Sequence, residues 1–148
     1  RKMAELYAIK GEAERALQTY NEALDINRGD LEALQGRAKL HQGRGDVTAA
    51  SADYERIVSL LAAPRGSDQY RIRAAALLKL GMADQALPAA EQALSMRPDS
   101  PVALETRGVV FEALGRKEEA IADLKRALSF SSNLPSSRDA LRRLGLSE

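Results

Sequence analysis

The chain repeats one short pattern four times, a glycine followed five residues later by an alanine. The glycines are Gly11, Gly45, Gly81 and Gly115, and successive ones are separated by 34, 36 and 34 residues. When the four copies are aligned on their glycines, two further positions are also similar in every copy. A very small residue stands seven positions before each glycine (Ala4, Ala38, Ala74, Gly108), and a larger one stands four positions before it (Tyr7, His41, Leu77, Phe111). Such a period is typical of proteins that stack similar supersecondary units.

The last complete copy predicts that each unit is a pair of antiparallel helices. The first, helix A, is expected over 101–114, because proline suits the first helical turn and Ser100 or Asp99 can cap it. Gly115 suits the left-handed conformation that ends a helix. The second, helix B, is expected over 117–130. Glutamates in its first turn stabilise the helix, because they lie near the positive end of the helix dipole.

The repeated small residues predict where the two helices of a unit cross. Gly108 and Ala120 are expected at that crossing, since larger side chains there would push the helices apart. Four large apolar residues are expected to fill the space around it: Leu104, Phe111, Leu124 and Leu128. Hydrophobic residues make up 45% of the chain but aromatic ones only 4%. A core built mainly from Ala and Leu favours helix packing over a β-sandwich.

This pattern resembles the tetratricopeptide repeat of bacterial type. Segments 70–94 and 104–128 match its small, aromatic or aliphatic, glycine and alanine columns, and Pro98 stands where the family has its closing proline. The resemblance implies an all-α fold, a right-handed α-solenoid of antiparallel helix pairs. It implies a single array over 1–148, made of a partial repeat 1–30, repeats 31–64, 67–100 and 101–134, and a C-terminal capping helix 135–148.

Two features depart from a regular repeat. Arg65 and Gly66 lengthen the loop between the second and third units. Pro88 lies inside the expected helix B of the third unit, where it removes one backbone hydrogen bond and should bend the helix.

The segment after Pro135 is expected to form a short final helix, capped by Ser137 and stopped by Gly145. Repeat arrays need a terminal element with a polar outer face, because an end repeat otherwise exposes its stacking surface. The expected arrangement has leucines against the last repeat (Leu141, Leu144) and arginines in water (Arg138, Arg142).

Charge and composition limit the classes of partner. Lys and Arg number 22 against 21 Asp and Glu, so no net field attracts nucleic acid. The basic clusters also lack interleaved aromatic residues on which bases could stack. The longest unbroken apolar run, 74–78, is far shorter than the roughly 20 residues of a membrane-spanning helix. We therefore predict no nucleic-acid partner and no membrane insertion.

The compartment stays open between the cytoplasm and the periplasm for what we expect to be a soluble protein. There is no Cys to indicate a redox environment. Because the chain opens on Arg1 rather than Met, we expect that the natural N-terminus lies upstream, together with any targeting signal.

Side chains that support catalysis or bind cofactors are scarce. The chain has no Cys and one His, His41, which occupies the column of Tyr7 and Phe111 and is expected to be a packed structural residue. No second His or carboxylate cluster accompanies it as a metal site, and no glycine-rich phosphate loop is present. We predict that the protein is not an enzyme and has no cofactor or metal.

Arginine recurs one residue before the small position of helix A, at Arg37, Arg73 and Arg107. A basic binding stripe is one interpretation. A structural or solvated role is the interpretation we favour, because this column often holds arginine in bacterial repeats of the family.

The resemblance implies a concave groove lined by the A helices. Its predicted partner-binding residues are Gln35, Lys39, Gln42, Arg71, Ala75, Lys79, Glu105, Val109 and Glu112. This lining is basic in the middle and acidic toward the C-terminal end, which favours a peptide with acidic residues near one end and basic ones near the other. The carboxylate clamp of chaperone-associated members is not matched in either register. Its columns hold Gln35, Lys39, Ile72, Val102 and Thr106 or, one unit earlier, Arg1, Glu5, Gly36, Asp68 and Ile72.

The sequence therefore predicts a non-catalytic scaffold or adaptor that binds a peptide or helix of a partner protein in this groove. Two alternatives stay open. The chain could be a self-assembly module that forms homo-oligomers, or a regulatory segment of a larger protein with further domains.

Overall fold

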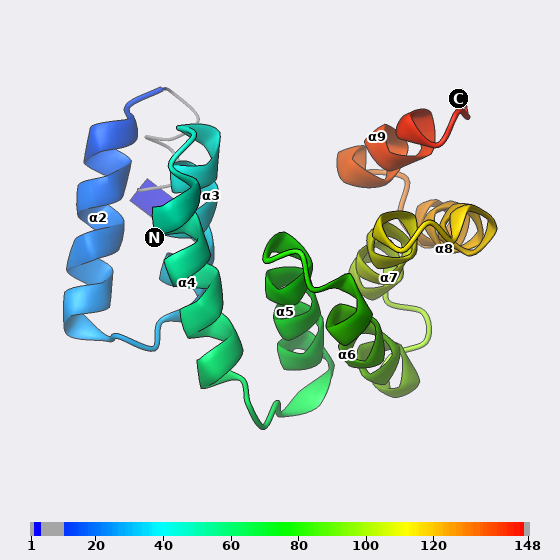
Figure 1. Cartoon of the computed structure of the whole chain (residues 1–148), viewed down its shortest axis with the longest axis horizontal. Coiled ribbons are helices and arrows are strands. Elements are labelled where there is room, and N and C mark those ends of the chain that lie inside the picture. Colours follow the sequence, from blue (N-terminus) through cyan, green and yellow to red (C-terminus); the bar gives the residue numbers. More distant parts are fainter. Residues whose placement is uncertain (1, 4–10, 147–148) are drawn as a thin grey trace. The chain divides into compact units, whose positions relative to one another are not determined.

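The computed structural model describes residues 2–3 and 11–146, and every regular element in these ranges is a helix (Figure 1). The helices are α2 (Ala13–Ile26), α3 (Leu31–Gly43), α4 (Val47–Leu60), α5 (Gly66–Lys79), α6 (Ala83–Met96), α7 (Pro101–Ala113), α8 (Lys117–Phe130) and α9 (Pro135–Arg143). They fall into two compact units. The first comprises residues 1–62 and contains α2 to α4, and the second comprises residues 63–148 and contains α5 to α9.

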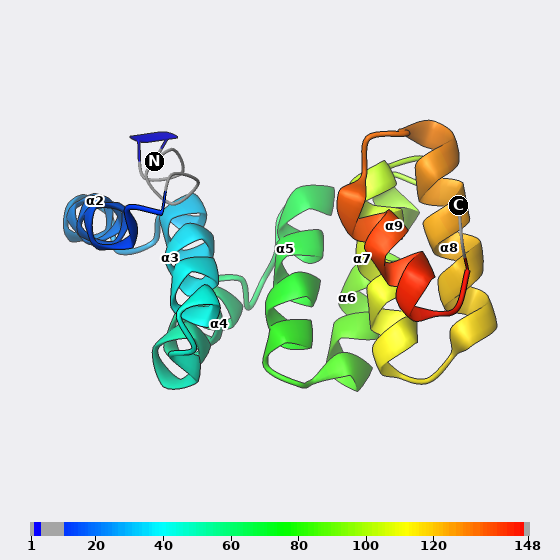
Figure 2. The same cartoon turned by 90° about the horizontal axis from the view of Figure 1, so that it is seen from above.

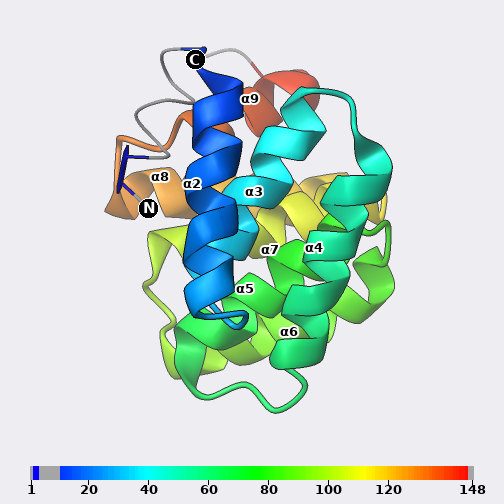
Figure 3. The same cartoon turned by 90° about the vertical axis from the view of Figure 1, so that its left-hand side faces the viewer.

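Each unit is built from helices that pack against their neighbours in sequence. In the first unit α3 packs against both α2 and α4 (Figures 1 and 3). In the second unit α5 pairs with α6 and α7 with α8, α7 also contacts α5 and α6, and α9 contacts α7 and α8 (Figure 2). The pairs α3/α4, α5/α6 and α7/α8 are the expected helices A and B of three units. The single array that would join the two units stays a prediction.

Local sequence signals set the helix ends. Helix α7 begins with Pro101, and the Ser100 hydroxyl accepts a hydrogen bond from the Ala103 N–H at 3.2 Å. This satisfies one of the free donors of the first turn, as predicted for Ser100. Gly115 has φ +76°, and α8 begins two residues later. The expected helices over 101–114 and 117–130 are thus confirmed to within one residue.

The turns between helices A and B share one hydrogen-bond pattern. In each, the N–H after the glycine donates to the carbonyl five residues earlier at 2.9 Å: Asp46 to His41, Met82 to Leu77, and Arg116 to Phe111. Each glycine is left-handed, with φ near +77°, a conformation that costs glycine little and other residues more. The repeated glycine therefore reverses the chain in the same way each time.

The crossing of α7 and α8 depends on the missing side chain of Gly108. A Cβ there would lie 2.8 Å from Cγ of Leu124 and 3.4 Å from the Ala120 carbonyl oxygen. Ala120 and Leu124 are both fully buried. The prediction that Gly108 and Ala120 mark the crossing is confirmed. Two small residues of the same column, Ala38 and Ala74, are also fully buried, whereas Ala4 lies outside the described residues.

A charged pair joins helix A to helix B in two of the repeats. The Arg107 guanidinium donates to Asp123 at 2.6 and 2.8 Å, and Arg37 donates to Asp53 at 2.9 and 2.7 Å. The hydrogen bonds to these carboxylates raise the pKa of both arginines, against a smaller opposing effect of burial. The structural role favoured for this column is confirmed at Arg37 and Arg107. At Arg73 the corresponding partner position holds Ala89.

The start of α9 differs from the prediction. Leu134 is the cap residue and makes no side-chain cap hydrogen bond, while Pro135 opens the helix. Ser137 lies inside the helix and is fully buried. Its hydroxyl donates to Glu105 instead of capping the helix, so the prediction of a Ser137 cap was wrong. Because α9 already begins at Pro135, Ser137 lies in its first turn and its side chain packs inward.

The end of α9 follows the prediction more closely. Gly145 has φ +91°, and the Leu146 N–H donates to the Leu141 carbonyl, which is the same stop as in the A–B turns. Leu141 and Leu144 are half-buried, and Arg142 is exposed. Arg138, which was expected in water, is also half-buried.

Two other residues singled out in the sequence, Pro88 and His41, both lie within helices. Helix α6 continues without interruption from Ala83 to Met96, with the exposed Pro88 inside it. His41, expected as a packed residue, lies half-buried in the last turn of α3.

Replacing Gly108 with Ala should destabilise the second unit. Overpacking costs about 1–3 kcal/mol, and the gain in helix propensity over glycine returns about 1 kcal/mol. Gly43→Ala is the matched control, because no packing atom lies within 4 Å of its Cβ position. It should therefore raise stability by about 0.5–1 kcal/mol. Urea denaturation followed by circular dichroism measures both. Equal stabilisation by the two changes would contradict the proposed crossing.

Candidate functional site

A cleft of about 310 Å³ lies within the second unit, where α5, α7 and α9 meet. Each helix contributes three lining residues: Ala75, Leu78 and Lys79 from α5; Glu105, Thr106 and Val109 from α7; Ser136, Asp139 and Arg143 from α9. On each helix most of these residues are spaced three or four positions apart, which places them on one helix face. Since α5 and α7 are successive A helices, the cleft lies on the A-helix side of the second unit.

Two polar links tie α9 to α7 at the cleft. The Arg143 guanidinium donates to both carboxylate oxygens of Glu112, at 2.9 and 2.8 Å. These hydrogen bonds raise the pKa of Arg143, against a smaller effect of burial. The buried Ser137 hydroxyl donates to Oε2 of Glu105 at 2.5 Å. Hydrogen bonds to a carboxylate are stronger than neutral ones, so these links hold α9 against α7.

The remaining charges of the cleft are more available to a ligand. Lys79 is exposed, and no described residue forms an ion pair or hydrogen bond with its side chain. Asp139 pairs with Arg142 at 2.8 Å, but both side chains are more than half exposed. Such a surface pair contributes little. The cleft therefore offers a free cation on the α5 side and a weakly held carboxylate on the α9 side, together with the apolar side chains of Ala75 and Val109.

Comparison with known proteins identifies the fold family. Sequence models described as Tetratricopeptide repeat match residues 73–137 and 2–30, which together exceed half of the chain. The chain belongs to the tetratricopeptide repeat family. This confirms the resemblance and the all-α solenoid class. Repeats of this family are generally non-catalytic scaffolds for protein–protein interaction.

Solved structures of the family are similar over almost the whole chain. A thermophilic TPR protein from Thermus thermophilus is 27% identical with a TM-score of 0.73, over 97% of this chain and 78% of that one. PilW, a type IV pilus biogenesis factor, has 20% identity, a TM-score of 0.73 and coverage of 97% and 66%. YrrB, a TPR protein described as having an unusual peptide-binding site, has 19% identity, a TM-score of 0.56 and coverage of 97% and 81%.

The cleft unites four of the residues predicted for the groove of the repeat: Ala75, Lys79, Glu105 and Val109. Glu112 borders the cleft through its bond to Arg143. Arg71 does not line it. Its guanidinium lies 3.9 Å from Asp68, and its Nε makes no hydrogen bond to any described residue.

The other three predicted residues lie on α3, in the first unit. Lys39 is exposed, Gln35 is half-buried, and Oε1 of Gln42 accepts a hydrogen bond from the Tyr54 hydroxyl at 3.3 Å. A groove shared by these residues and the second unit stays a prediction.

Sequence reasoning missed the contribution of α9, which it treated only as a cap. A usable signal was present. Adding the repeat length of 34 to the positions of Val102, Glu105 and Val109 gives Ser136, Asp139 and Arg143, which are the three cleft residues of α9. The last helix thus continues the columns of the preceding A helices, although its own sequence is much more polar. Thr106 stands in a column of the carboxylate clamp, but its residue type does not match that clamp, so it was not predicted to bind a partner.

Neither a metal site nor a membrane span occurs in the described part of the chain. No group of three or more His, Cys, Asp or Glu side chains there could hold a metal ion. No helix over residues 2–3 and 11–146 is long and apolar enough to cross a membrane. The cleft itself presents charged, hydrogen-bonding and apolar side chains to a ligand.

Replacing Ser137 with Ala should loosen α9 without unfolding the repeat beneath it. The change leaves the half-buried carboxylate of Glu105 without its hydroxyl donor, which costs about 1–3 kcal/mol. Hydrogen exchange should then accelerate for the amides of α9 while those of α7 stay protected. Ser136→Ala on the exposed neighbour is the control. Unchanged exchange in α9 would show that the Ser137–Glu105 bond does not hold the helix.

Proposed function

We propose that the chain is a protein-interaction scaffold whose α5–α7–α9 cleft binds a peptide or helix of a partner protein. The observation that carries the proposal is the convergence of three helices on one cleft. It combines Lys79, which pairs with no described residue, a weakly held carboxylate and apolar residues. Ligand sites combine apolar lining with a few placed polar groups in this way. The description of YrrB as having a peptide-binding site supports the same kind of ligand.

The charges of the cleft indicate the order of side chains along the peptide. An acidic side chain fits beside Lys79 on α5, and a basic one fits beside Asp139 on α9. An apolar residue between them would contact Val109 and Ala75. This order keeps the direction of the gradient predicted from the sequence, but its acidic residue is Asp139 in place of Glu105 and Glu112, which α9 engages. The proposed partner is a protein rather than a nucleic acid, because the lining carries both signs of charge and no aromatic ring.

Charge reversal in the cleft tests the proposal. Lys79→Glu combined with Val109→Glu should weaken partner binding by more than about tenfold, since the complex loses one ion pair and one apolar contact. Lys125→Glu is the matched control, because Lys125 is exposed on α8 and does not line the cleft. Partners are captured from lysates of the source cell with each variant and identified by mass spectrometry.

A protein that binds the wild type and the Lys125→Glu variant but not the double variant is the expected result. Partners retained equally by all three would place the binding surface elsewhere. Far-UV circular dichroism checks that the double variant keeps its helices.

Self-assembly is a second candidate function, and the exposed ends of the B helices favour it. Helices α2, α4, α6 and α8 each end in a large apolar residue that is at least one-third exposed: Ile26, Leu60, Met96 and Phe130. Contiguous apolar patches often mark protein interfaces, whereas apolar residues exposed singly are ordinary. The recurrence at the same end of each B helix is what favours an interface here.

Light scattering over a range of concentrations separates the two functions. Self-assembly predicts a mass that rises with concentration and falls in the Met96→Ser/Phe130→Ser variant. A constant monomer mass at high concentration would exclude it.

A further inference from the structure

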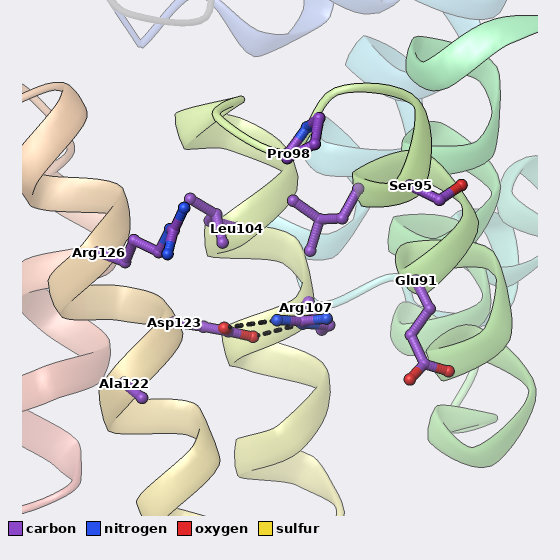
Figure 4. Close-up of a pocket in the computed structure, with 9 residues that line it drawn as sticks. Glu91, Ser95, Pro98, Leu104, Arg107, Ala122, Asp123 and Arg126 are labelled. Carbon is purple, nitrogen blue, oxygen red and sulfur yellow. Dashed lines mark hydrogen bonds and ion pairs between the residues drawn. The ribbon is translucent and has the colours of Figure 1, made fainter.

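Two equivalent pockets lie against the B helices, one in each unit, and neither shares a residue with the α5–α7–α9 cleft. The pocket of the second unit has a volume of about 530 Å³ and is lined by α6, α7, α8 and the α6–α7 loop (Figure 4). The pocket of the first unit has about 470 Å³ and is lined by α2, α3, α4 and the α2–α3 loop. Six lining residues of the first-unit pocket recur unchanged 70 positions later in the second-unit pocket: Leu24, Leu34, Arg37, Ala52, Asp53 and Arg56.

One charged pair forms part of the wall of each pocket and is already neutralised. Figure 4 shows the Arg107 guanidinium joined to Asp123, and Arg37 is joined to Asp53 in the same way. Asp53 and Asp123 are only 4% and 6% exposed. These pairs link helix A to helix B, so they are structural parts of the pockets.

The two pockets differ in the environment of the arginine at their rim. In the second unit Arg126 lies 3.6 Å from the carboxylate of Asp99. The position that corresponds to Asp99 in the first unit is Gly29, which has no side chain to offer. No described residue pairs with the side chain of Arg56, the counterpart of Arg126. Both side chains of the Asp99–Arg126 pair are more than half exposed, so this pair is weak. The exchange of aspartate for glycine removes even this weak competitor from Arg56.

A second arginine adds to the charge of the first-unit pocket. Arg28 stands where the second unit has Pro98, and it likewise pairs with no described residue. The first-unit pocket thus carries two guanidinium groups that lack a carboxylate partner in the described part of the chain.

The charge of the two linings differs accordingly. Three arginines and two aspartates line the first-unit pocket, whereas two arginines, Glu91 and Asp123 line the second. The first thus has one excess positive charge and the second has none. Apolar surface accompanies this charge, since two leucines and Ala52 line the first-unit pocket. The partly exposed Leu60 lies beside Gly29, in the loop that borders this pocket.

We propose that the pocket of the first unit binds an acidic side chain of a protein partner, with Arg28 and Arg56 donating to the carboxylate. An aliphatic residue next to it in the partner contacts Leu24, Leu34 and Ala52. Guanidinium groups suit carboxylates because their N–H groups match both oxygens. The apolar lining favours a peptide over a free anion, which would use the charges alone. This surface is additional to the proposed peptide cleft.

The probe is a short fluorescein-labelled peptide of alternating Glu and Leu, and fluorescence anisotropy measures its binding to the full chain. Arg28→Ala with Arg56→Ala should weaken binding by roughly tenfold or more, since each charge-assisted hydrogen bond contributes about one power of ten. Gly29→Asp should also weaken it, by a smaller factor, because its carboxylate would compete for Arg56 as Asp99 does for Arg126 in an exposed and weak pair. A Cβ fits there, with its nearest neighbours at 3.6 and 3.7 Å.

Arg126→Ala is the matched control and should leave the affinity unchanged, as should Lys125→Glu, because Lys125 is exposed and lines neither the pockets nor the cleft. The proposal is overturned if the probe does not bind, or if the double arginine variant binds it as well as the wild type. Equal weakening by Arg126→Ala would also overturn it. A probe with Gln in place of Glu that binds equally well, or full displacement of the probe by inorganic phosphate, would show that the pocket does not select an acidic peptide.

Discussion

The close approach of helix A to helix B is the constraint on which the other features depend. At Gly108 the helices come so near that a Cβ would lie 2.8 Å from Leu124, and alanines occupy the same column in other repeats. This proximity lets Arg107 reach Asp123, 16 residues away, with two hydrogen bonds. Larger residues at the crossing would disrupt both the apolar contact and the ion pair.

The paired helices then present two kinds of surface from one repeated pattern. The A helices place their columns around the α5–α7–α9 cleft, and the B helices border the two pockets whose linings recur 70 positions apart. Six lining residues are the same in both pockets, whereas the residues of the bordering loops differ. Gly29 in place of Asp99 leaves Arg56 without the carboxylate that Arg126 has. Small changes at loop positions therefore alter charge without altering the fold.

Helix α9 shows why a terminal segment is hard to interpret from its sequence. Its serines near a proline suggested a cap, and its arginines suggested a solvated face. In the structure Ser137 is buried against Glu105, and Arg143 binds Glu112, 31 residues away. The helix both covers the last repeat and forms one side of the cleft. The repeat register contained this information, but composition alone indicated only a polar cap.

The sequence by itself determined the helices, their turns and the repeated small positions, because these depend on local signals: glycine with positive φ, the Ser100 cap, the early prolines and the spacing of apolar residues. It also placed four of the cleft residues on A-helix faces. Only the tertiary structure decided which charged groups have a partner. Glu105 and Glu112 are engaged by α9, while Lys79 and Arg56 have no partner among the described residues. Polar links between residues 16 to 32 positions apart depend on how the helices pack, and no local pattern in the sequence specifies that distance.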